Sequence, residues 1–340
     1  MSPSTRPESD ARSGQTPSTR PESDARSGQA LIHPQAREVI DYLSRLGLPP
    51  IDQVPVPEAR RQYRETRAAL RPPAPEVAEV RDLEAGGTGG PIPLRLYRPT
   101  GGVLPAFIYF HGGGWVVGDL DTHDVVCRQI ASLANAAVIA VDYRLAPEHR
   151  FPAAADDAWS ATTWCAKHAE ELGIDPRRMA VGGDSAGGGL AALVALMARD
   201  SQRLRLALQV LIYPVLDLRA QTASYSAYAE GYLLTRAAMQ WYIAQYAPTA
   251  DVVNDWRASP LLAPWVHGVA PALVIAAELD PLFDEGEAYA RRLQGARVPV
   301  EYHRVEGMVH GFLTMGGKVD AANRAVETIA GALQKAFTKA

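Results

Sequence analysis

The chain has 340 residues, of which 47% are hydrophobic and 21% are charged, and its formal net charge is −4 at pH 7. This near-average composition excludes a fibrous or wholly disordered chain, and the absence of a basic stripe argues against a nucleic-acid partner. No apolar run approaches the roughly 20 residues that are needed to span a bilayer, and no apolar signal segment follows Met1. We therefore expect a cytoplasmic protein without a membrane span.

The first 29 residues are predicted to be a disordered tail. They contain no Leu, Ile, Val, Phe, Tyr or Trp, so they cannot bury enough apolar surface to offset the entropy lost on ordering. The segment Pro3–Gln15 recurs letter for letter as Pro17–Gln29, which favours a duplication or cloning artefact over a functional repeat. The rest of the chain is long enough for one large core.

Residues 30–75 are predicted to contain two polar-faced helices, Pro34–Leu46 and Pro57–Leu70. Prolines separate the two helices and follow the second, and proline stops a helix. Next, Val77–Leu83 and Ile92–Arg98 flank a cluster of four glycines. This pattern predicts an antiparallel pair of strands joined by a Gly-rich loop.

Through the rest of residues 76–340, short apolar runs alternate with segments that are long enough to form helices. The runs are rich in Val, Ile and Tyr and lack strict alternation, as expected of strands that are buried on both faces. The alternation predicts an α/β fold with a mainly parallel sheet and helices on both faces, and the preceding pair brings the sheet to eight strands. The six further strands are expected at Ala106–Phe110, Ala137–Val141, Met179–Val181, Leu208–Tyr213, Ala272–Ala276 and Val300–Arg304. The helices are expected at Asp124–Ala134, Ala153–Leu172, Ala186–Arg199, Glu285–Gln294 and Ala321–Lys335.

Residues 217–257 break this rhythm and are predicted to be a mainly helical insertion. Aromatic side chains are concentrated in it, and they either pack together or line a substrate pocket; the sequence leaves both open. They are Tyr225, Tyr228, Tyr232, Trp241, Tyr242 and Tyr246.

The segment Ala180–Leu193 reads AVGGDSAGGGLAAL and carries the chemistry-bearing motif GxSxG. The motif falls where a predicted strand ends and a helix begins, which is the context of a nucleophile elbow. Such a turn is tight, so side chains must be absent at Gly183 and Gly187. It would expose the Ser185 hydroxyl and aim the Ala186 N–H at a developing oxyanion. We therefore predict that Ser185 is a nucleophile.

A serine hydroxyl is a weak nucleophile, so it requires a base, and the base requires an orienting acid. On this type of fold the histidine comes last along the chain. His267, His303 and His310 follow Ser185. His303 falls inside a predicted strand and His267 lies between prolines, whereas His310 lies in a Gly-containing loop after a strand. His310 is therefore the predicted base.

The predicted acid comes from the segment that follows the strand Ala272–Ala276. Asp280 lies just beyond the carboxyl end of that strand, where active sites of open α/β sheets collect. Asp284 and Glu278 are alternatives, for which helix capping or loop hydrogen bonding is the simpler role. Asp280 is the preferred partner of the histidine.

The sequence HGGGW begins at His111, directly after the first central strand. Consecutive glycines at 112, 113 and 114 leave peptide N–H groups free to face a pocket, and such a loop supplies the second half of an oxyanion hole. Gly113 and Gly114 are the preferred donors, with Gly112 a third candidate. His111 is expected to hold this loop by hydrogen bonds rather than to act as a second base. A phosphate-binding loop is the rival interpretation, but GxxxxGK[ST] is absent.

Five motifs in this order resemble the hormone-sensitive-lipase-like branch of the α/β-hydrolases. They are HGGGW, DYRLAPEHRFPAAADD at 142–157, GDSAGG around the serine, ELDPLFDEG at 278–286 and GMVHGF around the last histidine. The resemblance spans about Val77 to the carboxyl terminus. It implies a carboxylesterase of α/β-hydrolase fold with a helical cap, built from residues 30–75 and the insertion at 217–257. It also implies a triad of Ser185, Asp280 and His310, with an oxyanion hole from the glycine loop and Ala186.

The remaining polar clusters have simpler roles. Asp119, Asp121, His123 and Asp124 resemble a metal-binding group, but loop and helix capping is favoured for them. Asp184 is expected to be structural, as are Asp156 and Asp157. Neither Cys127 nor Cys165 has the spacing of a disulfide framework or a zinc site. No metal and no cofactor is expected.

The predicted activity is hydrolysis of short-to-medium-chain carboxylic esters through an acyl-enzyme, with a small-molecule ester as partner. Two alternatives use the same scaffold. An amidase or aryl-formamidase needs the same triad, so the sequence does not separate it from an esterase. A non-catalytic ligand-binding receptor is disfavoured because the histidine loop is intact. The strand at Val300–Arg304 is a candidate for pairing across a homodimer.

Overall fold

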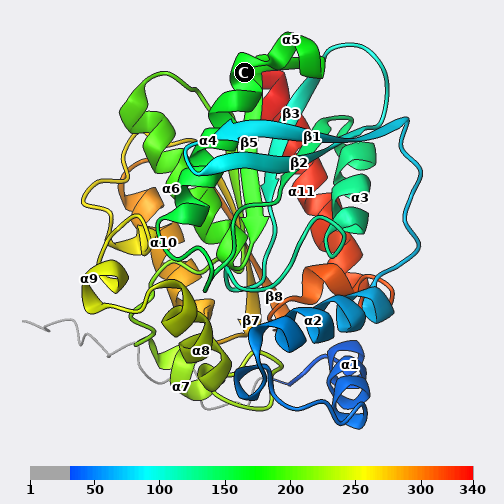
Figure 1. Ribbon diagram of the computed structural model, residues 1–340, viewed down its shortest axis with the longest axis vertical. Helices are drawn as coiled ribbons and strands as arrows, with labels where there is room; N and C mark the ends of the chain where they lie inside the picture. The colour runs from blue at the N-terminus through cyan, green and yellow to red at the C-terminus, as the bar shows by residue number, and fades with distance from the viewer. Residues whose placement is uncertain (1–30, 340) are drawn as a thin grey trace, which may run out of the picture. The chain divides into compact units, whose positions relative to one another are not determined.

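The structure is a computed structural model that describes residues 31–339, so the tail predicted at residues 1–29 lies outside the described residues. From Ile32 onward, the chain surrounds an eight-stranded sheet of order β1-β2-β4-β3-β5-β6-β7-β8 (Figure 1). The pairs β1–β2 and β2–β4 are antiparallel and the others are parallel. The prediction of an eight-stranded, mainly parallel sheet is confirmed. The strands are β1 (Glu79–Gly87), β2 (Gly90–Arg98), β3 (Leu104–Phe110), β4 (Ala137–Val141), β5 (Ile174–Asp184), β6 (Leu208–Ile212), β7 (Ala272–Leu279) and β8 (Val300–Val309).

The central strands carry unbroken apolar runs because helices cover both faces of the sheet. Every residue of β4, β6 and β7 is buried, whereas β1 at the edge mostly alternates between half-buried and exposed positions. Among the covering helices, α3 packs against α11 and α4 packs against α6 (Figure 1). These helices are α3 (Asp124–Ala134), α4 (Ala153–Lys167), α5 (Ala169–Leu172), α6 (Ala186–Ser201), α10 (Phe283–Gly295) and α11 (Asp320–Lys339).

Two predicted elements differ from the structure. The helix expected at Ala153–Leu172 is two helices, separated at His168, whose ring stacks on Trp164 at 4.2 Å and whose Nδ1 lies 2.9 Å from the Trp164 carbonyl oxygen. The glycines between β1 and β2 do not form a loop, since three of them belong to the strands and only Thr88 and Gly89 make the turn. Both differences come from side-chain or pairing contacts that apolar periodicity does not report.

Three strands are longer than their apolar cores. β5 begins at Ile174 rather than Met179, β7 continues to Leu279, and β8 continues to Val309. The added positions include charged residues such as Asp175 and Glu278, which an apolar pattern assigns to loops. The extensions matter because β7 and β8 thereby run directly up to Asp280 and His310.

Two separate segments lie at the carboxyl end of the sheet (Figure 1). The first contains α1 (Pro34–Arg45), a 3₁₀ turn η1 (Ile51–Gln53) and α2 (Val56–Leu70), which confirms the two predicted helices. The second contains short helices, and its α8 contacts η1 of the first. The short helices of the second segment are α7 (Ala223–Ala227), α8 (Arg236–Tyr246), α9 (Ala250–Val253) and the 3₁₀ turn η2 (Pro260–Leu262).

Two aromatic residues of the insertion make different contacts. Tyr246 stacks on Trp115 with ring centroids 4.4 Å apart, and Phe151 packs edge-on against Tyr246. The ring of Tyr242 instead lies against Gly114, where it would overlap a Cβ atom. Tyr246 therefore serves packing, whereas Tyr242 borders the glycine loop after β3.

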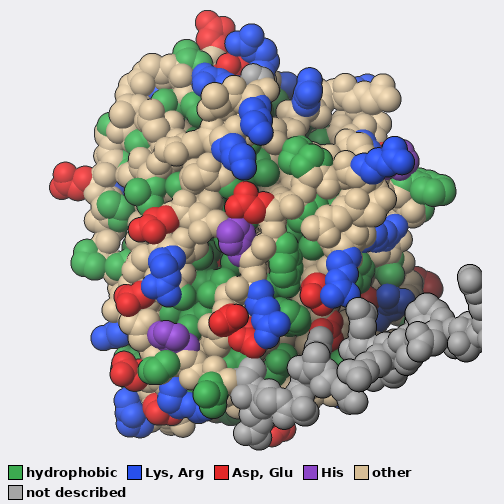
Figure 2. All heavy atoms as spheres, turned by 180° about the vertical axis from the view of Figure 1, so that it is seen from behind, with side chains coloured by type: hydrophobic (Ala, Val, Ile, Leu, Met, Phe, Trp, Pro, Cys, Tyr) green, Lys and Arg blue, Asp and Glu red, His purple; other side chains and the backbone are tan. Residues whose placement is uncertain are grey.

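The surface carries interspersed charges. On the face shown in Figure 2, basic and acidic side chains lie among apolar ones. Among the described residues, many charged side chains form ion pairs; one example is Arg304 with Glu278. None of the described helices is both long enough and apolar enough to cross a membrane.

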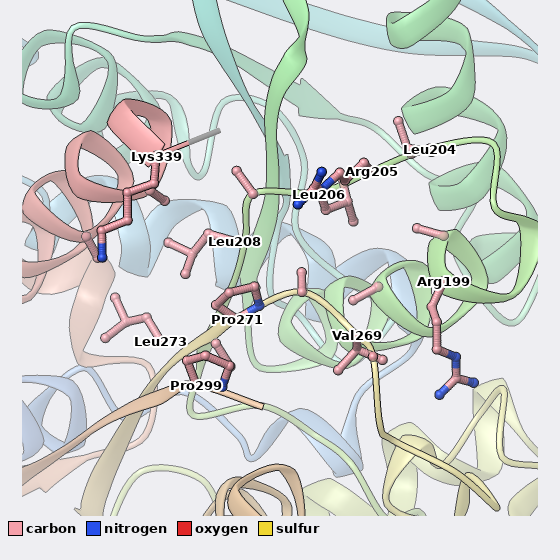
Figure 3. Close-up of a pocket in the computed structure, with 18 of the residues that line it drawn as sticks. Arg199, Leu204, Arg205, Leu206, Leu208, Val269, Pro271, Leu273, Pro299 and Lys339 are labelled. Carbon is pink, nitrogen blue, oxygen red and sulfur yellow. The ribbon is translucent and has the colours of Figure 1, made fainter. Parts of the chain in front are cut away.

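A groove of about 1110 Å³ opens at the amino ends of β6, β7 and β8 (Figure 3). Leu208 and Leu273 contribute apolar surface to it, and Arg199, Arg205 and Lys339 contribute cationic side chains. In a parallel sheet the amino ends of the strands lie at the opposite edge from the carboxyl ends. This groove is therefore separate from the predicted site.

Glu285 on α10 anchors the chain that leaves β6. Its side chain is fully buried, and its Oε1 accepts a hydrogen bond from the Leu216 N–H at 2.9 Å. Its Oε2 has no hydrogen-bond partner among the described residues. Burial raises the pKa of Glu285 well above its ordinary value, because a carboxylate is poorly solvated inside a protein. The buried side chain therefore resists ionisation.

We predict that Glu285→Gln changes the pH dependence of stability. A carboxyl group with a higher pKa in the folded chain binds more protons there. Its stabilising contribution is therefore full below the unfolded pKa of about 4.5 and is lost as pH rises towards the folded pKa. Glutamine keeps the acceptor for Leu216 without the titration. The Tm of the variant relative to the native protein should therefore be more favourable at pH 8 than at pH 5, as measured by thermal unfolding.

The matched control is Glu285→Ala, which loses the acceptor and should lower Tm at both pH values. A Tm difference between Glu285→Gln and the native protein that is equal at pH 5 and pH 8 would show that folding does not raise the pKa of Glu285.

Candidate active site

Ser185 occupies a strained turn between β5 and α6. Its backbone has φ 56° and ψ −119°, a region that residues with a side chain rarely adopt. The turn is held on both sides, since the Ser185 N–H donates to the Ile212 carbonyl at 2.8 Å and its carbonyl accepts from Val215 N–H at 3.0 Å. Neighbouring β6 thus fixes the backbone of Ser185.

The glycines of GxSxG are required by the backbone that approaches this turn. A Cβ atom at Gly183 would lie 2.3 Å from the Phe110 carbonyl oxygen, and one at Gly187 would lie 1.9 Å from the same oxygen. Backbone cannot yield as the end of a flexible side chain can, so any larger residue would displace the end of β3. The motif therefore reflects the contact between β3 and the serine turn.

His310, Asp280 and Ser185 form a continuous hydrogen-bonded chain. The His310 Nε2 lies 2.9 Å from Ser185 Oγ, and the His310 Nδ1 lies 2.7 Å from Asp280 Oδ2. Asp280 is fully buried, and its other oxygen accepts from the Leu282 N–H at 2.9 Å. The three residues directly follow β5, β7 and β8, so the sheet brings their side chains together at its carboxyl edge.

The competing acids contact other groups. Asp284 accepts a hydrogen bond from the Ser224 N–H at 2.7 Å and so connects α10 to α7. Glu278 pairs with Arg304 and accepts from the Gly307 N–H at 2.7 Å, which supports the segment that leads to His310. Of the three candidate acids, only Asp280 is hydrogen-bonded to the histidine.

The two other histidines that follow Ser185 in the sequence make contacts outside this hydrogen-bonded chain. His303 pairs with Glu301 at 2.8 Å on an exposed part of β8. The ring of His267 packs edge-on against Trp265, whose side chain is exposed.

The loop after β3 places its glycines beside the serine turn. Gly113 has φ +132° and Gly114 has φ +58°, and a Cβ atom at either would overlap neighbouring atoms, namely the Val117 carbonyl and the Tyr242 ring. The described residues present no acceptor to the N–H groups of Gly113 and Gly114. These two groups are therefore available to a ligand.

The structure corrects one predicted donor. The Gly112 N–H donates to Asp184 Oδ1 at 2.9 Å, so this group is already occupied and cannot hold an oxyanion at the same time. A Cβ atom at Gly112 would lie 2.3 Å from Asp184 Oδ2. Gly112 thus has a structural reason to be glycine.

Asp184 connects the nucleophile turn to the glycine loop. Besides Gly112, its Oδ1 accepts from the Tyr109 hydroxyl at 2.8 Å and lies 3.2 Å from His123 Nε2. Burial opposes its charge, but the neighbouring His123 and Tyr109 together lower the pKa of Asp184 to about 2. A buried carboxylate with several donors is the arrangement that keeps such a group ionised. The expected structural role of Asp184 fits these contacts.

His111 is buried and neutral. Burial is the largest influence on it and lowers its pKa to about 4. Its ring stacks on Tyr143 at 4.3 Å, and its Nδ1 lies 2.9 Å from the Gly112 carbonyl oxygen. The Tyr143 hydroxyl in turn donates to the His111 carbonyl at 2.7 Å. These contacts hold the loop in place, and the ring contacts neither Ser185 nor Asp280.

The acidic cluster at residues 119–124 is neutralised by arginines. Asp119 pairs with Arg64 at 2.5 Å, Asp121 with Arg95 at 2.7 Å, and Asp124 with Arg128 at 2.7 Å. Within residues 31–339, no three possible metal-ligating side chains converge on one point. The cluster therefore ties the loop before α3 to its surroundings.

The motifs did not single out two residues near the histidine. The Tyr213 ring lies 4.7 Å from the His310 ring, and its backbone has φ 34°. Arg67 of α2 lies against Gly311, the residue after the histidine. Arg67 is more than 240 positions from His310 along the chain, so no local pattern connects the two.

A parallel sheet that carries a serine on a strained strand–helix turn, with aspartate and histidine after later strands, defines an α/β-hydrolase. The alpha/beta hydrolase fold family matches residues 107–314, and the chain belongs to this family.

Relatives extend the match over most of the chain. The chain is 45% identical to a carboxylic ester hydrolase, LipN, of Mycobacterium tuberculosis, over 76% of this chain and 72% of the relative. It is 42% identical to an ethyl acetate hydrolase of Pseudomonas putida, over 84% of this chain and 92% of the relative. A crystal structure of a thermostable esterase from Pseudomonas putida superimposes with a TM-score of 0.88 at 36% identity, covering 92% of this chain and 99% of that one. The resemblance to the hormone-sensitive-lipase-like branch is thereby confirmed.

Proposed function

We propose that this protein hydrolyses carboxylic esters through an acyl-enzyme formed on Ser185. The observation that carries the proposal is the hydrogen-bonded chain from Ser185 Oγ through His310 to Asp280, with distances of 2.9 and 2.7 Å. The relatives named as ester hydrolases support the choice of ester over amide.

The first step makes the bond between Ser185 and the substrate. His310 Nε2 accepts the hydroxyl proton as Ser185 Oγ attacks the carbonyl carbon, and the carbonyl π electrons move onto oxygen. Asp280 accepts the hydrogen bond from His310 Nδ1–H, which fixes the tautomer and stabilises the imidazolium. His310 then gives its proton to the departing alcohol as the tetrahedral intermediate collapses. A water molecule then gives a proton to His310 Nε2 and attacks the acyl carbon. The bond between that carbon and Ser185 Oγ breaks, His310 returns the proton to Ser185, and the carboxylic acid is released.

The N–H groups of Gly113, Gly114 and Ala186 are assigned to the oxyanion. The two glycines have unoccupied N–H groups, and Ala186 opens α6, where the first N–H groups have no partner inside the helix. A donor of this kind contributes about 3 kcal/mol of transition-state stabilisation. Asp184 connects the two sources of donors, because it ends β5 directly before the serine turn and its side chain accepts from the Gly112 N–H.

Residues 30–75 and 217–257 are proposed to form a single cap over this site. Tyr242 of α8 contacts Gly114, and Arg60 of α2 donates to the Val116 carbonyl at 2.8 Å and to the Ala146 carbonyl at 3.1 Å. Both segments therefore contact the loop that carries the glycines. An enclosed site of this kind suits small esters.

We predict that Ser185→Ala lowers the kcat for p-nitrophenyl butyrate by roughly a millionfold, since the nucleophile and its base act as a unit. Thermal unfolding should be close to that of the native protein. A fluorophosphonate probe should label the native protein and not the variant. Substantial remaining turnover, or labelling of the variant, would contradict the assignment of Ser185.

The acid is tested with a matched pair. Asp280→Asn should lower kcat by about 10⁴-fold because it favours the wrong tautomer of His310, whereas Asp284→Asn should retain most of the activity. The reverse order would assign the acid to Asp284.

We expect short-to-medium acyl chains to be preferred. The Tyr242 ring against Gly114 and the Trp115–Tyr246 stack limit the room beside the glycine loop. The kcat/KM for p-nitrophenyl butyrate should exceed that for p-nitrophenyl palmitate, measured below and above the solubility limit. A maximum at palmitate together with activation by an interface would contradict this expectation.

A homodimer through β8 is also proposed. This strand is an edge of the sheet, paired with β7 alone among the described strands, and its residues 300–304 are available to a second copy. Sedimentation should give twice the chain mass for the native protein. The chain mass alone, at micromolar concentration, would contradict the dimer.

A further inference from the structure

Arg67 places a guanidinium in the site from the cap helix α2. Its Nη2 lies 3.2 Å from the position that a Cβ atom would take on Gly311, and its Cζ lies 3.7 Å from the same point. Gly311 has φ +76° and directly follows His310. The guanidinium therefore fills the space that the absent side chain leaves beside the catalytic histidine.

Other residues of the site surround this cation. The Arg67 Cζ lies 4.8 Å from the centroid of the Tyr63 ring, one turn earlier on α2. Tyr213, whose ring lies beside His310, and Asp184, which precedes the nucleophile, are within electrostatic range of the guanidinium. Tyr242, which borders Gly114, is also within that range. The charge thus lies among residues that border both the histidine and the glycine loop.

No carboxylate of the described residues forms an ion pair with Arg67. Its Nε is buried without a hydrogen-bond partner within residues 31–339. By contrast, Arg60, Arg61 and Arg64 of the same helix each pair with an acid. Desolvating a cation is costly unless an anion or several acceptors replace the water. The ring face and the hydroxyl of Tyr63 compensate for the lost water only in part, because neither supplies a negative charge.

We propose that Arg67 binds a carboxylate group of the substrate, so that the enzyme acts on esters which carry a free carboxylate besides the scissile bond. The planar guanidinium fork matches a carboxylate in two parallel hydrogen bonds. Because Arg67 carries one positive charge and forms no ion pair within the described residues, a substrate group with one negative charge would match it. This inference rests on the proposed ester hydrolysis and adds the substrate class.

The carboxylate can belong to the acid or to the alcohol part of the ester, and two matched substrate pairs separate these sources. For the acid part, p-nitrophenyl hemiglutarate is compared with the neutral p-nitrophenyl valerate. For the alcohol part, 4-acetoxybenzoate is compared with 4-acetoxybenzamide. In each pair the charged and neutral esters have nearly the same size, so the ratio of their kcat/KM values reports recognition of the charge.

The variants are Arg67→Gln, Arg67→Lys and the control Arg61→Gln. Arg61 lies on the same helix but pairs with Glu58 and Glu65 at the surface, so its loss removes the same charge away from the site. In at least one pair, Arg67→Gln should lower the charged-to-neutral ratio by about tenfold or more, mainly through KM. Arg67→Lys should give an intermediate ratio, and Arg61→Gln should keep the native ratio.

Each outcome has a defined meaning. If Arg67→Gln leaves the charged-to-neutral ratio of kcat/KM unchanged in both pairs, the inference is overturned. It is also overturned if the native enzyme hydrolyses the neutral esters but neither charged ester. A similar fall in Arg61→Gln would assign the effect to long-range charge and would also overturn it. If the native enzyme hydrolyses none of the four esters, the proposed function itself fails, which is a separate result.

Discussion

The carbonyl oxygen of Phe110, at the end of β3, lies so close to the turn around Ser185 that positions 183 and 187 tolerate no side chain. This contact brings two loops from adjacent parallel strands to within backbone distance of each other. One loop carries Ser185, the proposed nucleophile, and the other carries the N–H groups of Gly113 and Gly114. The oxyanion hole needs donors from both, so the close packing of β3 against β5 is a condition for the chemistry as well as for the fold.

Buried polar side chains hold the loops at this edge of the sheet in position. Asp184 remains ionised because Tyr109, Gly112 and His123 surround it, and it connects the glycine loop to the serine turn. Glu285 accepts a hydrogen bond from the Leu216 N–H, but burial outweighs such bonds and raises its pKa. The two acids show that burial raises the pKa of a carboxyl group and that enough neighbouring donors reverse this shift. Arg67 is the reverse case, a cation beside Gly311 that forms no ion pair with an acid of the described residues.

Much of the site could be predicted because its signals are local. A strand followed by GxSxG and a helix specifies the nucleophile turn within a few residues, and the order of serine, acid and histidine along the chain limits the choice of base. The candidate acids Asp280 and Asp284 are only four positions apart. The choice of Asp280 depended on its position directly after β7. Apolar periodicity placed the strand cores correctly. It began β5 too late and ended β7 and β8 too early. Of the charged residues within these strands, Glu278 contacts Arg304 and Gly307 on β8, whereas Asp175 pairs with the neighbouring Arg177 and Arg178.

By itself, the sequence determined the α/β class, the parallel sheet, the nucleophile turn and the order of the catalytic candidates, because each is encoded in short-range patterns of apolar, glycine and polar residues. Only the tertiary structure decided which backbone N–H groups are unoccupied, and it removed Gly112 from that set because Asp184 reaches it from β5. It also decided that Arg67 of the cap lies beside Gly311. Contacts of this kind join residues far apart in the chain, and the packing of loops and helices at the carboxyl edge of the sheet determines them.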